Sequence, residues 1–161
     1  MSLEDISELV ISHLKPRIPI IQGGMGVGVS MSGLASAVAN AGGIGIIATA
    51  GIGVDEPDYQ SNFGEANKRG LKKEIIKANR KTDGIFGVNI MVALTDFDDL
   101  LKISVDKKVD IVILSAGLPV KVPRIISPER MHEISTAFVP VVSSARAANI
   151  VLKYWGKYNI Y

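Results

Sequence analysis

A glycine-rich stretch near the amino terminus carries the residue types best suited to hold a ligand. The apolar run Ile18–Gln22 passes directly into Gly23, Gly24 and Met25. Glycines at the point where a chain leaves a sheet remove side chains, so a flat or anionic ligand can approach the backbone closely. The alternative is that these glycines only let a helix pack close to a strand.

Small or polar residues also follow the later apolar runs of the chain, namely Asn89, Ser115, Ala116, Gly117, Ser143 and Ser144. An amide side chain both donates and accepts hydrogen bonds, so Asn89 suits the edge of a heterocycle. Asn89 also has the turn preferences of a residue that simply follows a strand. Small side chains together with one amide favour a flat, neutral ring system over a metal ion.

Other common sites are not encoded in this sequence. Residues 24–29 read GMGVGV, which does not fit G-x-G-x-x-G, and no P-loop, H-E-x-x-H or G-x-S-x-G pattern occurs. With no cysteine, the chain has neither a disulfide scaffold nor a thiolate metal site. His13 and His132 fall on predicted helices away from the strand ends. We therefore expect no metal site, and we expect neither histidine to be a catalytic base.

The elements that must position these residues alternate between short apolar strands and helices. The predicted strands are 18–22, 44–48, 85–89, 110–114 and 138–142, and the predicted helices are 3–13, 32–41, 65–79, 96–106, 128–136 and 145–155. Ser30 or Ser32 and Asp96 are expected to cap helices. Continuous apolar runs alternating with helices are typical of a parallel α/β fold. Ligands bind at the carboxyl edge of such a sheet, where the small and polar residues gather.

Length and composition restrict the fold and the class of protein. The 161 residues form a single domain, 1–161, and fit an open doubly wound sheet better than a (β/α)8 barrel, which needs about 250 residues. Hydrophobic residues make up 47% and the net charge is +2, which favours a globular protein over a nucleic-acid or membrane binder. We expect a cytoplasmic protein, because neither a leader pattern nor an apolar run of about 20 residues occurs.

Five segments, in order, resemble successive motifs of the nitronate monooxygenase (2-nitropropane dioxygenase) family. They are IPIIQGGM (18–25), LASAVANAGGIGII (34–47), FGVNIMV (86–92), DIVILSAGLP (110–119) and VPVVSSAR (139–146). The related flavin-containing enoyl-ACP reductases share nearly the same set. The resemblance covers essentially the whole chain. It implies a TIM-type FMN-binding (β/α)8 barrel, of which this chain holds about the first five βα units, and so overrides the preference drawn from length.

The resemblance also implies a cofactor, an activity and a set of cofactor-binding residues. The family oxidises alkyl nitronates with O2, and its reductase relatives reduce an enoyl thioester with NAD(P)H. By similarity, the loop of Gly23, Gly24 and Met25 passes under the isoalloxazine ring of FMN. Asn89 would then hydrogen-bond the ring or the ribityl chain. The remaining residues of this implied cavity are Ala116, Gly117 and Ser143.

Two parts of the family pattern are expected outside this sequence. The catalytic histidine of the family lies in a glycine-glycine-histidine loop on the next strand, which would come beyond Tyr161, and the phosphate-binding loops come later still. The resemblance therefore implies no catalytic side chain within these 161 residues, and inactivity of this chain alone. Five strands of a barrel would expose two unpaired edges. A homo-oligomer, or pairing with a complementary half of a barrel, is thus an open alternative.

Overall fold

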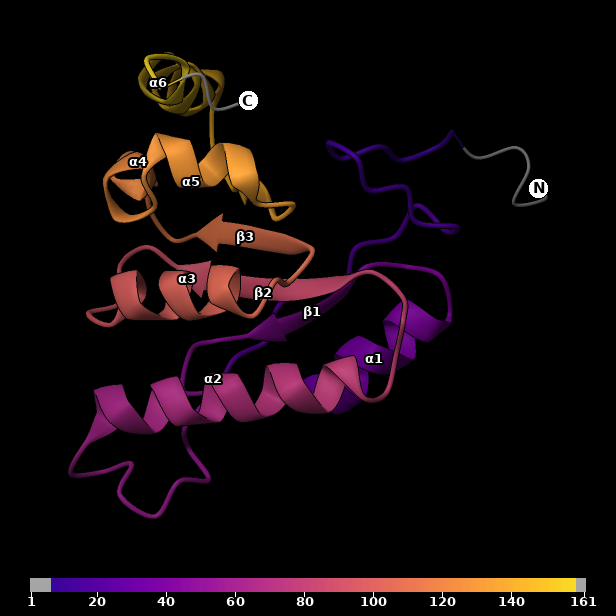
Figure 1. Cartoon of the computed structure of the whole chain (residues 1–161), viewed down its shortest axis with the longest axis vertical. Helices are drawn as coiled ribbons and strands as arrows, with labels where there is room; N and C mark the ends of the chain where they lie inside the picture. Colours follow the sequence, from indigo (N-terminus) through magenta and orange to yellow (C-terminus); the bar gives the residue numbers. More distant parts are fainter. Residues whose placement is uncertain (1–6, 159–161) are drawn as a thin grey trace.

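The computed structural model describes residues 7–158, which form a parallel four-stranded sheet and the helices that connect its strands (Figure 1). The strands lie in chain order, β1-β2-β3-β4, and each pairs in parallel with the next. Their bounds are β1 Gly45–Ala48, β2 Phe86–Met91, β3 Ile111–Ser115 and β4 Ala137–Pro140. The predicted α/β fold with a parallel sheet is therefore confirmed.

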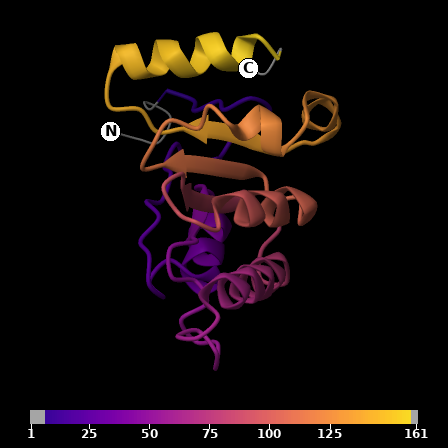
Figure 2. The same ribbon diagram turned by 90° about the vertical axis from the view of Figure 1, so that its left-hand side faces the viewer.

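The helices follow the strands in the expected alternation. They are α1 Ser32–Asn40, α2 Phe63–Asn79, α3 Phe97–Asp106, α4 Val122–Ile125, α5 Pro128–Glu133 and α6 Ala145–Gly156. Figure 2 shows α2 and α3 on one side of the sheet and the indigo amino-terminal segment on the other, while α6 lies beyond β4. Among residues 7–158, no helix is both long and apolar enough to cross a bilayer.

The two faces of the sheet bury different apolar clusters. Side chains alternate along each strand, so Val88 and Val112 pack into the larger core, against buried residues of the helices such as Leu100. Ile46 and Ile111 belong to the smaller cluster on the opposite face, where Leu14 packs against them. The amino-terminal segment thus covers the face that would be the inside of a barrel.

The first predicted strand, 18–22, forms only a single parallel bridge, between Ile21 and Ile44. The Ile20 N–H donates to the Ile18 carbonyl at 2.7 Å, a tight turn around Pro19 that takes these residues out of strand geometry. Gln22 still donates its backbone N–H to the Ile44 carbonyl, at 3.0 Å. Residues 18–22 therefore lie beside β1 as a fifth, irregular strand position.

The predicted amino-terminal helix is wrong for the residues that the structure describes. Residues 3–6 lie outside the described residues, and 7–13 contain no helix. Instead, Ile11 and Leu14 exchange backbone hydrogen bonds of 3.0 and 2.9 Å across a turn in which Ser12 has a φ of 54°. The turn places Leu14 under the sheet, and this tertiary burial overrides the helical spacing. The short helix α4 was not predicted.

Candidate functional site

The loop from Gly23 to Met25 is fixed in place at the carboxyl end of the sheet by two polar side chains. The Ser30 hydroxyl accepts hydrogen bonds from the Met25 N–H and from the Gln22 side-chain amide, both at 3.0 Å. Gln22 also donates to the Ile46 carbonyl at 2.9 Å and accepts from the Ile46 N–H at 3.2 Å. Gln22 thereby replaces with its side chain the pairing that an irregular strand cannot complete.

Asn89 lies directly against this loop. A Cβ added to Gly24 would come within 2.7 Å of Asn89 Cβ and Nδ2, whereas a Cβ added to Gly23 would meet nothing within 4 Å. The Asn89 side chain is oriented by Ser115, whose hydroxyl donates to Asn89 Oδ1 at 2.7 Å. Within residues 7–158, Asn89 Nδ2 has no hydrogen-bond partner. The amide group beside the glycine loop is therefore available to a ligand acceptor.

The remaining predicted residues form a second part of the site. Ala116, Gly117 and Ser143 line one cavity of 380 Å³, together with Val141 and Val142, at the carboxyl ends of β3 and β4. Because Ala116 follows Ser115 in the chain, this cavity begins next to the Asn89 hydrogen bond. The seven predicted residues thus lie along one edge of the sheet, in two groups that the end of β3 connects.

The turn after β3 uses left-handed backbone conformations. Ala116 has a φ of 53° and Gly117 a φ of 149°. Residues other than glycine rarely adopt the φ of Gly117. A Cβ on Gly117 would also lie 3.1 Å from the Val92 Cβ. The loops after β2 and β3 therefore touch, and this contact holds Ala116 at the cavity.

The sequence did not indicate the residues that support the site, and one of its two predicted caps is wrong. Ser30 and Ser32 do not cap α1, whose N-cap is Met31 without a side-chain bond. Asp96 does occupy the predicted N-cap position of α3, but its side chain makes no capping bond and its carboxylate accepts from the Asn67 amide at 2.8 Å. Ser30 faces the glycine loop because its hydroxyl satisfies the Met25 N–H, a tertiary bond with no local sequence signal.

The site is electrically neutral, and the ionisable groups whose pKa is shifted lie elsewhere in the molecule. None of the seven predicted residues carries an ionisable side chain. On α2, burial alone would raise the pKa of Glu74, but hydrogen bonds from Lys77 (2.6 Å) and the Ser32 N–H (2.9 Å) outweigh it and hold the pKa below its ordinary value. Glu74 thus ties α2 to the start of α1.

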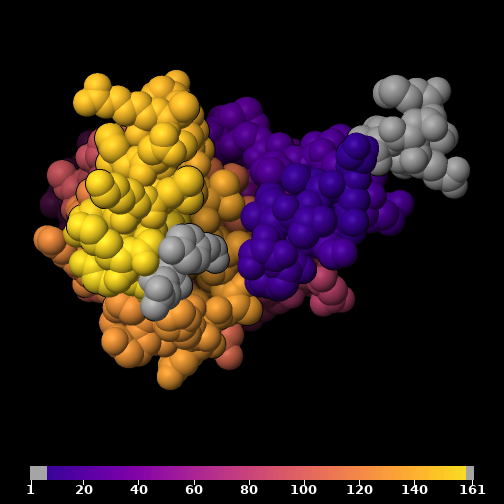
Figure 3. Space-filling view, turned by 90° about the horizontal axis from the view of Figure 1, so that it is seen from above, coloured from indigo at the N-terminus to yellow at the C-terminus, as the bar shows by residue number. Residues whose placement is uncertain are grey.

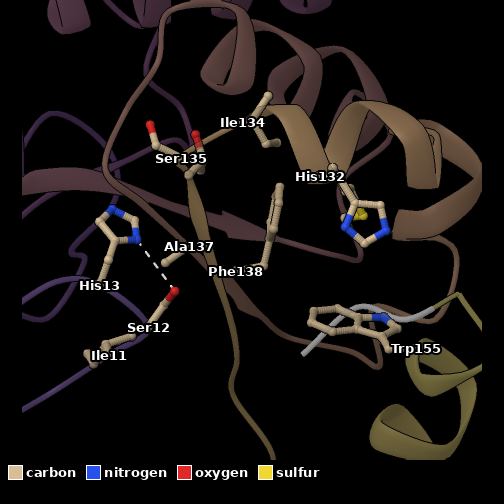
Figure 4. A pocket seen from close by; sticks show the side chains of 11 residues that line it. Ile11, Ser12, His13, His132, Ile134, Ser135, Ala137, Phe138 and Trp155 are labelled. Carbon is tan, nitrogen blue, oxygen red and sulfur yellow. Dashed lines mark hydrogen bonds between the residues drawn. The ribbon is translucent and has the colours of Figure 1, made fainter.

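The two histidines lie at the other end of the sheet. His13 and His132 line a cavity of 320 Å³ around the first residues of β4, Ala137 and Phe138 (Figure 4). Strands of a parallel sheet start at one edge and end at the opposite one, so this cavity lies away from Asn89. The prediction that neither histidine belongs to the strand-end site agrees with this arrangement.

The four-stranded parallel sheet and the helices that connect its strands form part of a β/α barrel. Residues 7–103 match the nitronate monooxygenase family, and the chain belongs to that family. It is similar to FabK from Thermotoga maritima, with 37% identity and a TM-score of 0.64 over 84% of this chain and 37% of that one. The relatives are oxidoreductases of a flavin-dependent family. They therefore support the flavoprotein class that the motifs suggested.

Two further relatives are similar to this chain, one in sequence and the other in fold alone. The "(3aS,4S,5R,7aS)-5-hydroxy-7a-methyl-1-oxo-octahydro-1H-indene-4-carboxyl-CoA dehydrogenase" of Mycobacterium tuberculosis is 33% identical, over 86% of this chain and 33% of its own length. A nitroalkane oxidase from Streptomyces ansochromogenes is 22% identical with a TM-score of 0.66, over 85% of this chain and 44% of that one, which shows the shared fold alone. The chain spans about a third of the length of the curated relative.

Proposed function

We propose that this chain forms the flavin-ring part of an FMN-dependent oxidoreductase of the nitronate monooxygenase type, which oxidises alkyl nitronates with O2. The observation that carries the proposal is the position of Asn89, with Nδ2 unpartnered among the described residues, directly against Gly24. Membership of the family supports the same assignment. The substrate is a small molecule.

The residues present fit a flavin ring. There is no room for a Cβ between Gly24 and Asn89. Because Gly24 has no side chain, the loop and the Asn89 amide together form a flat surface at the edge of the sheet. Ser115 holds Asn89 Oδ1, which leaves the NH2 group to donate to a ring nitrogen or carbonyl. Bound FMN supplies the redox chemistry, and these residues bind and orient its ring.

The cavity at the carboxyl ends of β3 and β4 fits the same ligand. Ala116, Gly117 and Ser143 line it with small side chains, and Val141 and Val142 give it an apolar wall. A neutral lining of this kind suits an aromatic ring, and it holds no charge that would bind a metal ion or a phosphate. We assign no catalytic side chain to residues 7–158, since His13 and His132 lie at the opposite edge.

A second candidate function is reduction of an enoyl thioester with NAD(P)H. It is favoured by the relatives above 30% identity, FabK and the CoA-linked dehydrogenase. At the end of the glycine loop and just after it, the apolar side chains of Met25, Val27 and Val29 are 47%, 70% and 58% exposed. An acyl chain would bury such a surface, whereas a short nitronate would leave most of it in water.

Both candidate functions require the chain to bind flavin, and a flavin titration of the purified 161-residue chain tests this binding. We expect the fluorescence of FMN and of riboflavin to be quenched on binding with similar affinity, because the proposed contacts are to the ring. Turnover of propyl-2-nitronate with O2, compared with NADPH-dependent reduction of a crotonyl thioester, then separates the two reactions in protein that includes the histidine loop. We expect neither turnover from this chain alone. Absence of flavin binding would overturn both functions.

A further inference from the structure

A valine occupies a backbone conformation that valines rarely adopt. Val27 has a φ of 51° and Gly28 a φ of 80°, and the Val29 N–H donates to the Gly26 carbonyl at 3.4 Å. Two positive φ values inside a four-residue turn are typical of type I′, whose first central position is usually Asn, Asp or Gly. Val27 occupies that position, and a β-branched side chain there costs conformational free energy.

Burial within residues 7–158 does not recover this cost. Val27 is 70% exposed, more than any other large apolar residue in that part of the chain. The other non-glycine residues there with positive φ are Ser12, Lys108 and Ala116, none of which is β-branched. Val27 thus combines backbone strain with an exposed, large apolar side chain. Because strain of this kind is concentrated at functional sites, we look for a function of the side chain.

Backbone contacts hold the turn close to Asn89. The Val27 N–H donates to the Ala50 carbonyl at 2.8 Å. Ala50 follows Thr49, whose N–H and hydroxyl both donate to the Asn89 carbonyl at 3.0 Å. A Cβ added to Gly26 would lie 3.0 Å from the Ala50 carbonyl oxygen, so the turn packs closely against this segment. Val27 is therefore fixed near the edge of the sheet where the flavin ring is proposed to bind.

The apolar surface around Val27 is small and has a charged boundary. Val29 is 58% exposed and Val54 is 38% exposed, and the Val54 Cγ1 lies 3.9 Å from the position of a Cβ on Gly28. After Val54 the chain continues with the acidic segment 55–58. A specific protein–protein interface uses about 800 Å² on each partner, far more than three valine side chains provide. The surface instead has the size of a hydrocarbon chain.

We propose that Val27 is a specificity-determining residue, which together with Val29 binds the hydrocarbon chain of the substrate while the reactive group lies at the flavin ring. Asn would be more stable at this position of the turn, and burial of the valine against a chain of four or more carbons recovers the cost. This inference rests on the proposed flavin site, and it applies to an alkyl nitronate and to an enoyl thioester alike. The site therefore favours long-chain over short-chain substrates.

Binding of 1-alkyl nitronates to the riboflavin-loaded 161-residue chain tests the inference. The dissociation constant, measured by flavin absorbance, should fall by about tenfold or more from ethyl to hexyl nitronate, or about twofold for each partly buried CH₂ group. In protein with ¹³C-labelled valine methyl groups, the signals of Val27 and Val29 should shift with hexyl nitronate and stay in place with ethyl nitronate. Both measurements report binding and do not require turnover.

The same substitution at three exposed valines separates the contact from the strain. Val27→Asn should reduce the ethyl-to-hexyl ratio to less than about threefold. Because Asn tolerates positive φ, this variant should also raise the melting temperature of the flavin-free chain by about 2–4 °C. Val29→Asn should reduce the ratio without raising the melting temperature, since Val29 does not have a positive φ.

Val10→Asn is the matched control. Val10 is 50% exposed and belongs to the indigo amino-terminal segment of Figure 3. It precedes Ile11, which lines the cavity at the opposite edge of the sheet from Asn89. This variant should change neither the ethyl-to-hexyl ratio nor the melting temperature.

Riboflavin affinity, measured first, distinguishes failure of this inference from failure of the flavin site. A chain-length ratio that Val27→Asn leaves unchanged, Val27 methyl signals that stay in place, or a melting temperature that Val27→Asn does not raise would each overturn the inference and leave the flavin site standing. Absence of riboflavin binding would overturn the flavin site and the inference with it.

Discussion

The Ser115 hydroxyl at the end of β3 donates a 2.7 Å hydrogen bond to Asn89 Oδ1 on the neighbouring strand β2. This bond selects one orientation of the amide and leaves Nδ2 beside Gly24. An amide held in this way loses little conformational freedom when a ligand binds to it. The pair therefore makes Asn89 a preorganised donor at the edge of the sheet where the flavin is proposed to lie.

Replacing Asn89 should weaken flavin binding. Asn89→Ala removes the proposed hydrogen bond to the ring, and we expect a loss of about 1–3 kcal/mol, or roughly 5- to 150-fold in affinity, measured by fluorescence titration with riboflavin. Asn40→Ala is the control, because Asn40 is exposed on α1 and its amide donates only to the Lys81 carbonyl, at 3.0 Å. Equal affinity of the Asn89 variant and the unmodified chain would remove Asn89 from the site.

The two adjacent glycines of the loop should respond differently to the same substitution. Gly24→Ala would bring a methyl group within 2.7 Å of Asn89, so we expect it to displace the loop or the amide and to lower flavin affinity by about tenfold or more. Gly23→Ala meets nothing within 4 Å and should bind flavin nearly as well as the unmodified chain. If the two variants bind flavin equally, the loop does not contact the ring through this surface.

Most of the regular elements could be predicted from the sequence, because strands buried on both faces show continuous apolar runs. The helices over 97–106 and 145–156 also follow their apolar spacing closely. The segment 7–22 could not be predicted correctly. Its conformation depends on Leu14 packing under the sheet and on the turn around Pro19, and neither has a periodic pattern.

The edge on which the candidate residues lie was predictable, while the contacts among them were not. Parallel strands bring their carboxyl ends together, so topology alone predicts that Asn89 and Ala116 lie on the same edge of the sheet. The supporting bonds of Gln22, Ser30 and Ser115 join residues far apart in sequence, and a single sequence does not show such pairs. The left-handed backbone conformation of Val27 is likewise visible only in the structure.

Acid should destabilise the fold partly through Glu74. Its pKa is held below the ordinary value in the folded state, so its contribution to stability is present above the unfolded pKa of about 4.3 and is lost as pH falls through the folded pKa. We expect Glu74→Gln to cost about 1–3 kcal/mol near neutral pH and to flatten the pH dependence of urea unfolding below pH 5. Glu65→Gln is the control, since Glu65 is 54% exposed. An unchanged pH profile in the Glu74 variant would contradict the assignment.

Trp155 should anchor α6 to the loop that follows β3. Its buried Nε1 donates to the Pro119 carbonyl at 3.1 Å, and Trp155→Phe removes this bond while keeping an aromatic ring. We expect the free energy of unfolding to fall by about 1–2 kcal/mol. Tyr154→Phe, at the half-buried neighbouring position, should change it by less than about 0.5 kcal/mol. Similar effects of the two substitutions would mean that the Trp155 hydrogen bond contributes little.

The most direct test of the flavin site is an NMR titration of the ¹⁵N-labelled chain with riboflavin. We predict that the Asn89 side-chain NH2 and the Gly24 backbone amide shift together and saturate with one dissociation constant. The amide of Gly33, which lies in α1 with open space around it, should stay in place. Unmoved Asn89 and Gly24 signals, or shifts confined to the cavity of Ile11, His13 and Phe138, would contradict the proposal that this sheet edge binds the ring.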